Sequence, residues 1–173
     1  MRREIYRGRI VDLRVESVTL PNGTVVDLEL MHHIGAAAVV AADDRGRVVL
    51  IRQYRHAAGG FLWELPAGIL ASPDEAPEAC AARELREEAG LVAARLRRLG
   101  AIFTTPGFCD ERIHLFLARD LARGAHGHEA DEVITEIAWM PLPDVLAMIR
   151  RGEIVDGKTI CALHLAAAAL GGS

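Results

Sequence analysis

Three glutamates, Glu84, Glu87 and Glu88, lie three and four residues apart within residues 83–91. On a helix this spacing places their carboxylates on one face, where like charges weaken an isolated helix. Hard divalent cations such as Mg2+ prefer carboxylate oxygens and keep waters and substrate phosphates as further ligands. Taken alone, the three glutamates favour a merely solvated charged face. Together with Gly68, Arg83, Gly90 and the preceding loop, they favour a metal site.

The helix that would carry these glutamates has recognisable ends. Pro77 suits the first helical position, because proline lacks an N–H and its ring clashes deeper in a helix. Gly90 suits the residue that follows the last helical turn. A capping box from Ser72 to Glu75 offers an earlier start, but it would place Pro77 inside the helix. The sequence therefore predicts a helix over residues 77–89.

The remaining elements are predicted from short apolar or β-branched runs and their turns. Strands are expected at residues 15–20, 24–30, 36–41, 48–54, 61–65, 96–104, 113–118 and 134–140, and helices at 143–150 and 158–170. Turn residues at 21–23 and at 43–46 predict two hairpins. Mixed strands and helices predict an α/β (α+β) fold, an α/β/α sandwich with a mixed sheet and an N-terminal antiparallel strand extension.

Length, composition and net charge indicate a globular protein and give no support for a nucleic-acid-binding or membrane protein. The chain has 173 residues, 51% of them hydrophobic, and a net charge of -4. This predicts one globular domain over residues 1–173 and gives no electrostatic case for nucleic-acid binding. The three cysteines are far apart and form no Cys-x-x-Cys pair, which favours a reducing cytoplasm. No signal peptide or membrane-spanning run is apparent.

Residues 68–91 resemble the signature of the Nudix hydrolases. One extra residue lies between Gly68 and Glu75, in a turn where insertion costs little. The resemblance implies hydrolysis of a nucleoside diphosphate joined to a second moiety. It implies one to three Mg2+ or Mn2+ ions, which polarise the pyrophosphate and activate the attacking water. The implied metal ligands are the carboxylates of Glu84, Glu87 and Glu88 and the carbonyl of Ala67. Glu87 also completes or tunes the catalytic cluster.

Three further segments resemble the ADP-ribose pyrophosphatase branch of this family: residues 63–68, residues 52–55, and residues 105–111 with Pro106 fifteen residues after Leu91. The resemblance implies that ADP-ribose is cleaved to AMP and ribose 5-phosphate. The alternatives are a Nudix pyrophosphatase for a sugar nucleotide, NADH, FAD or a dinucleoside polyphosphate, and a nucleotide-sensing module without turnover. The three retained glutamates argue against the sensing module.

Several residues are candidates for binding the substrate. Arg55 can hold the pyrophosphate or the terminal ribose, because a guanidinium binds phosphate oxygens bidentately. Arg52 alternates to the other face of the sheet and is the second choice. Glu64 either binds a ribose hydroxyl or pairs with an arginine. Phe108 and Glu111 lie on the loop expected to shape specificity, where Glu111 can instead pair with a nearby basic residue.

By the same resemblance, the catalytic base comes from an acidic loop late in the chain, here residues 124–132. Glu129 is the first candidate, and Asp131 or Glu132 the second. Glu132 also matches a position that ligates metal in relatives. The flanking glycines predict mobility, and closure over substrate would exclude water.

The N-terminal strands, residues 1–33, correspond to the part that joins a two-fold partner in this branch, so a homodimer is expected. The related enzymes supply an arginine to the adenine–ribose pocket from the strand that enters the domain. Residues 26–29 contain no arginine here. Either adenine is recognised differently here, or Arg7 and Arg9 reach into the pocket.

Overall fold

Three sheets organise the chain in the computed structural model, which describes residues 2–125, 127 and 133–171. The strands are β1 (Arg2–Arg7), β2 (Asp12–Thr19), β3 (Val25–His32), β4 (Ala36–Ala41), β5 (Arg47–Arg55), β6 (Gly60–Glu64), β7 (Ala67–Ile69), β8 (Leu91–Phe103), β9 (Arg112–Arg123) and β10 (Ile134–Pro141). The helices are α1 (Pro77–Ala89), α2 (Leu142–Arg150), α3 (Gly157–Gly171) and the short 3-10 helix η1 (His56–Ala58).

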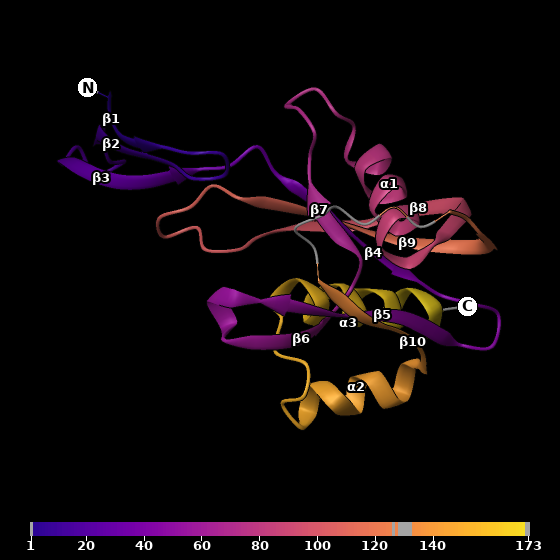
Figure 1. Cartoon of the computed structure of the whole chain (residues 1–173). Helices are drawn as coiled ribbons and strands as arrows, with labels where there is room; N and C mark the ends of the chain where they lie inside the picture. Colours follow the sequence, from indigo (N-terminus) through magenta and orange to yellow (C-terminus); the bar gives the residue numbers. More distant parts are fainter. Residues whose placement is uncertain (1, 126, 128–132, 172–173) are drawn as a thin grey trace.

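The central sheet has the order β7-β4-β9-β8 and is mixed, because β4 and β9 run parallel while its other pairs are antiparallel. Helix α1 lies on one side of it and α3 on the other (Figure 1). Strand β4 is buried throughout and packs both ways: Ala38 and Val40 face the core of α3, and Val39 faces the core of α1. The predicted α/β/α sandwich is therefore confirmed.

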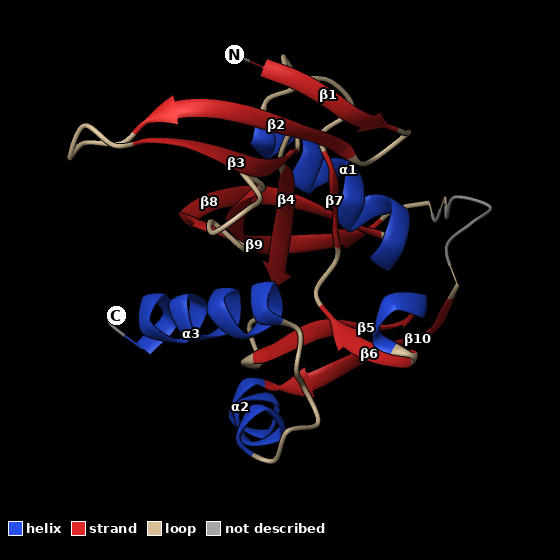
Figure 2. Cartoon of the chain, turned by 90° about the vertical axis from the view of Figure 1, so that its left-hand side faces the viewer, coloured by secondary structure: helices blue, strands red, loops and turns tan. Residues whose placement is uncertain are grey.

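A second sheet, of order β10-β5-β6, lies beside α2 and α3 (Figure 2). The turn at residues 43–46 forms as expected, with Gly46 at φ +73° and the Asp43 N–H donating to the Arg47 carbonyl. The predicted hairpin is nevertheless wrong. Only Ala42 and Val48 form a bridge, after which β4 and β5 enter different sheets. Each strand finds two other neighbours there, so both β4 and β5 are paired along their two edges.

The N-terminal sheet, β1-β2-β3, projects from the body (Figure 1). Its predicted turn is confirmed, since the Leu20 N–H donates to the Thr24 carbonyl and Gly23 has φ +85°. Large apolar side chains such as Tyr6 and Val25 are exposed on it. Among the described residues, no helix combines the length and the apolar character that a membrane span requires.

Helix α1 has the predicted bounds. Pro77 occupies its first turn, and Gly90 adopts φ +63° with its N–H directed to the Arg86 carbonyl. Leu85 is fully buried against the central sheet. The helix therefore presents its glutamates from a fixed position, with the short strand β7 packed alongside.

Candidate active site

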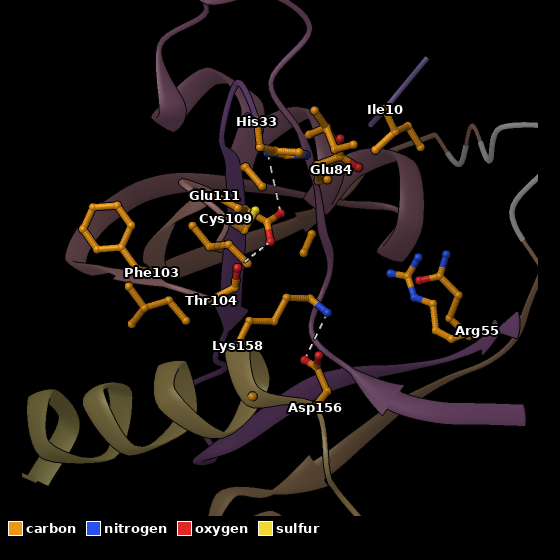
Figure 3. Close-up of a pocket in the computed structure, with 18 of the residues that line it drawn as sticks. Ile10, His33, Arg55, Glu84, Phe103, Thr104, Cys109, Glu111, Asp156 and Lys158 are labelled. Carbon is orange, nitrogen blue, oxygen red and sulfur yellow. Dashed lines mark hydrogen bonds and ion pairs between the residues drawn. The ribbon is translucent and has the colours of Figure 1, made fainter. Parts of the chain in front are cut away.

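A cavity of about 950 Å³ opens between α1, the end of β5, the start of α3 and the loop between β8 and β9. Figure 3 shows side chains from these separate elements pointing into one space. The lining includes Arg9, His33, Arg55, Ala67, Gly68, Arg83, Glu84, Glu87, Thr104, Glu111, Asp156 and Lys158. The elements are far apart in the sequence, so the cavity exists only in the folded chain.

The acidic side of the cavity is held against the backbone of β7. Glu84 is 6% exposed and Glu88 only 1% exposed. The Ala67 N–H donates to Glu88 Oε2 at 2.8 Å. A Cβ at Gly68 would lie 2.1 Å from Glu84 Oε1, closer than atoms can approach. A side chain at this position would force the Glu84 carboxylate to move, so the glycine leaves that carboxylate in place beside β7.

Arg83 balances the charge of this cluster. Its guanidinium pairs with Glu84, lies 3.3 Å from Glu75 Oε2 and 3.5 Å from Glu87 Oε2, and donates to the Ile69 carbonyl. Burial alone would lower the pKa of Arg83, but the hydrogen bond to Glu75 and the charge of Glu84 raise it. Arg83 therefore remains cationic and orients the carboxylates.

The glutamates fit a hard divalent cation in the type of their donors, all of which are oxygens, and in the space left by Gly68. Among the described residues, no three acidic, histidine or cysteine side chains form a ready-made metal cluster. Glu84 and Glu87 instead pair with Arg83 and Arg86. A cation would therefore have to compete with these arginines for the carboxylates.

Cys80 lies beneath this cluster and has no chemical role in it. Burial raises the pKa of its thiol to about 12. Its Sγ is 3.4 Å from the Gly68 carbonyl, to which it donates. A thiol with such a pKa is protonated at neutral pH and is not a nucleophile.

The opposite side of the cavity carries two cations, Arg55 and Lys158, both of them in ion pairs. Arg55 donates from Nε and Nη2 to the two oxygens of Glu64, each at 2.9 Å. Lys158 also contacts Glu64, and its Nζ lies 3.0 Å from Asp156 Oδ2. Of the two predicted roles for Glu64, pairing with an arginine is the one seen, and this carboxylate is 1% exposed. Arg55 is held at the edge of the cavity with donors to spare.

Lys158 and Asp156 were not predicted. Asp156 caps α3 by accepting the Thr159 N–H at 3.0 Å, and the Leu65 N–H donates to the Thr159 hydroxyl at 2.9 Å. These bonds fix the start of α3 against the end of β6, where Glu64 lies. One sequence signal was present: Lys158 is the only lysine among the 20 lysine and arginine residues.

Some of the other residues predicted to bind substrate line the cavity, and others do not. Glu111 lines the cavity, and its partner is the Thr104 hydroxyl at 2.9 Å. Arg9 also lines it, as expected if it replaces the missing arginine. Arg52 lies on the other face of its strand, over the rings of Phe61 and Trp63. Phe108 is 51% exposed. Neither Arg52 nor Phe108 lines this cavity.

The candidates for the base, Glu129, Asp131 and Glu132, lie outside the described residues. The residues that flank them are held beside the cavity. The Gly127 N–H donates to the Glu87 carbonyl at 3.3 Å, and the Tyr54 N–H donates to the Val133 carbonyl at 3.0 Å. Gly127 and Val133 therefore lie next to residues of the cavity wall.

The ion pairs of Glu64 give this site a pH-dependent contribution to stability. Burial alone would raise the pKa of Glu64, but the hydrogen bonds from Arg55 and the charge of Lys158 outweigh burial and lower the pKa. A carboxyl with a lowered folded-state pKa stabilises the fold above its unfolded pKa of about 4.3 and loses this contribution as the pH falls further.

We therefore expect Lys158→Met to lower the free energy of unfolding at pH 7 by about 1–2 kcal/mol, because Glu64 keeps Arg55 but loses its second cation. The deficit should shrink as the pH falls below about 4.3, because the contribution of ionised Glu64 is lost as the pH falls toward its lowered folded-state pKa. Urea unfolding at pH 7 and pH 3.5 measures this. Arg151→Met, which removes an exposed pair with Glu153, is the matched control. An equal deficit at both pH values would contradict the ionic explanation.

Comparison with known proteins completes the description of the site. The NUDIX domain family matches residues 31–163. An ADP-ribose pyrophosphatase of Mycobacterium tuberculosis is 42% identical over 160 residues, covering 90% of this chain and 76% of the relative. An ADP-ribose pyrophosphatase of Bacillus subtilis is 39% identical over 162 residues, covering 93% and 87%. A crystal structure of an ADP compounds hydrolase superposes with a TM-score of 0.85 at 21% identity, covering 99% and 92%, and supports the fold.

Proposed function

The chain belongs to the Nudix family, and from that premise we propose that it is a divalent-metal-dependent pyrophosphatase that hydrolyses ADP-ribose to AMP and ribose 5-phosphate. One observation carries the proposal: a single cavity has Glu84 and Glu87 on one wall and Arg55 and Lys158 on the other. The negative charge of a diphosphate suits Arg55 and Lys158, and its metal ions suit Glu84 and Glu87.

Mg2+ or Mn2+ is the proposed cofactor. Glu84, Glu87, Glu88 and the Ala67 carbonyl are the proposed ligands, and Glu132 is the proposed further ligand from the late loop. When bound, the metal offsets charge on the phosphates and makes a bound water more acidic. The space beside Gly68 and the oxygen-only donor set support this assignment.

The remaining residues bind and orient the substrate. Arg55 is fixed by Glu64, so it can bind phosphate oxygens with little loss of side-chain freedom. Lys158 supplies a second charge beside it. Glu111 and Arg9 are proposed to contact the sugar or base of the nucleotide. Positioning of this kind supplies much of the rate enhancement in pyrophosphate hydrolysis.

We assign the general base to the late acidic loop, with Glu129 as the first candidate and Asp131 or Glu132 as the second. The bonds of Gly127 to Glu87 and of Val133 to Tyr54 support this, since they hold Gly127 and Val133 beside the cavity. A base must reach the attacking water directly or through one further water.

Assembly and compartment complete the proposal. We propose a single domain in which residues 1–33 join a second copy as a homodimer, because β1–β3 project from the body with exposed apolar side chains. Analytical ultracentrifugation tests this. The free cysteines favour the cytoplasm. No nucleic-acid partner is proposed, since the net charge is -4.

Product analysis by chromatography tests the function. The panel is ADP-ribose, NADH, GDP-mannose, FAD and diadenosine polyphosphates, each with Mg2+ and with EDTA. AMP and ribose 5-phosphate, formed only with metal and with the highest kcat/KM for ADP-ribose, are expected. If another compound has the highest kcat/KM, the proposal of metal-dependent pyrophosphate hydrolysis stands and the proposed substrate is replaced by that compound. Metal and nucleotide binding without any turnover would overturn the proposal in favour of a sensing module.

A further inference from the structure

The loop of residues 104–111, between β8 and β9, is fastened to the end of β3. The Met31 N–H donates to the Phe108 carbonyl at 2.7 Å, and the Asp110 N–H donates to the Met31 carbonyl at 3.1 Å. Met31 and Cys109 thus form a parallel bridge. Figure 1 shows this loop extending toward the projecting N-terminal sheet. The loop and β3 are far apart in the sequence, so these bonds join two separate parts of the fold.

The Asp110 side chain adds two further contacts between this loop and the end of β3. Its Oδ1 accepts the His33 N–H at 2.7 Å, and its Oδ2 lies 2.7 Å from His32 Nδ1. These charge-assisted hydrogen bonds tie the carboxylate to two consecutive residues, His32 and His33, at the end of β3. The residue that follows Asp110 is Glu111, which lines the cavity.

The neighbours of Glu111 do not hold it in place by themselves. Within the part of the chain that the structure describes, the side chain that donates a hydrogen bond to Glu111 is the Thr104 hydroxyl, which belongs to the same loop. His33 Nδ1 lies 3.7 Å from Glu111 Oε1, too far for a hydrogen bond, and it accepts the Gly35 N–H at 3.0 Å. The position of the Glu111 carboxylate therefore depends on how the loop is anchored to the rest of the chain.

The anchor continues into the N-terminal sheet. His32 Nε2 lies 3.0 Å from Glu16 Oε1 on β2, and Arg2 Nε of β1 lies 2.6 Å from the same oxygen. A chain of polar contacts thus runs from β1 through β2 and β3 to Asp110. The sheet proposed to join the second copy is connected by these contacts to a residue of the cavity wall.

We propose that Asp110 is a positioning residue: its carboxylate fixes the loop of residues 104–111 on the end of β3 and so holds Glu111 where it can accept hydrogen bonds from the sugar hydroxyls of the substrate. The anchoring itself is a property of the fold. Its effect on substrate binding rests on the proposed function. Asp110 touches no reacting atom and acts through Glu111.

A double-mutant cycle tests the effect on binding. Asp110→Ala should raise KM for ADP-ribose by about ten-fold and leave kcat within about three-fold, because a binding group moves while the metal site does not. In a protein that already carries Glu111→Ala, adding Asp110→Ala should raise KM by less than about two-fold. Asp110→Asn keeps an oxygen for the His33 N–H and should restore KM to within about three-fold of wild type. Equal effects of Asp110→Ala in both backgrounds would overturn the proposal.

Amide hydrogen exchange tests the anchoring without activity. In Asp110→Ala the amides of Met31 and Asp110, whose hydrogen bonds join β3 to the loop, should exchange at least about ten-fold faster, because these bonds open more often. Asp44→Ala, which removes an exposed pair with Arg119, is the control and should leave them unchanged. Unchanged exchange in Asp110→Ala would also overturn the proposal. If Asp110→Ala fails to fold, Asp110→Ser replaces it in both experiments. If the wild type turns over no substrate, the proposed function fails while the exchange result still decides the anchoring.

Discussion

Glu88→Gln should lower kcat/KM for ADP-ribose by about 1,000-fold, equivalent to ~4 kcal/mol of transition-state stabilisation, while the enzyme remains folded. Glu88 is 1% exposed and sits between α1 and β7. Glutamine has nearly the same shape, and its amide oxygen can still accept the Ala67 N–H that Glu88 accepts at 2.8 Å. The substitution therefore removes a negative charge from the proposed metal site with little change in packing.

Glu88→Gln should not lower the stability of the protein, although it lowers the activity. Removing one of three neighbouring carboxylates relieves like-charge repulsion, so the melting temperature without metal should not fall. Mg2+ should raise the melting temperature of the wild type by mass action, and raise that of Glu88→Gln much less. Glu78→Gln, in the exposed first turn of the same helix, is the matched control. Activity of Glu88→Gln within a few-fold of wild type would show that Glu88 is not a metal ligand.

The parts of this site that sequence predicts are those encoded by nearby residues. The bounds of α1 follow from Pro77 at its start and Gly90 just after its end, and the helix between them has only thirteen residues. The alternation of a strand likewise separates Arg55, which lines the cavity, from Arg52, which lies on the other face. Both rules act over a few residues of backbone, so no knowledge of the rest of the fold is needed.

The parts that sequence did not predict depend on contacts between distant segments. A turn at residues 43–46 is visible in the sequence, but the divergence of β4 and β5 depends on β9 and β10, which compete for their edges. Lys158 reaches Glu64 across 94 residues, because Asp156 and Thr159 fix the start of α3. The role of Glu64 was open for the same reason, since its second partner could not be identified from local spacing.

Gly68→Ala should lower kcat/KM by about 100-fold, equivalent to ~3 kcal/mol, through a single added methyl group. Gly68 has no positive φ, so backbone strain is not the cause. The new Cβ would lie 2.1 Å from Glu84 Oε1 and 2.3 Å from Glu84 Cδ. The carboxylate would have to move, and it is 6% exposed and paired with Arg83. Relief of the clash therefore displaces a proposed metal ligand from its position.

The same clash separates a metal-site effect from general destabilisation. A carboxylate at the end of a side chain can rotate away, so the melting temperature should fall by only a few degrees, while titration with Mn2+ should show weaker binding. Gly100→Ala in β8 is the control, because its Cβ would meet Leu165 at an ordinary 3.8 Å. Wild-type activity in Gly68→Ala would show that catalysis does not require Glu84 in this position. Loss of activity with unchanged Mn2+ binding would instead place the role of Gly68 in substrate binding, because the space beside it also lines the cavity.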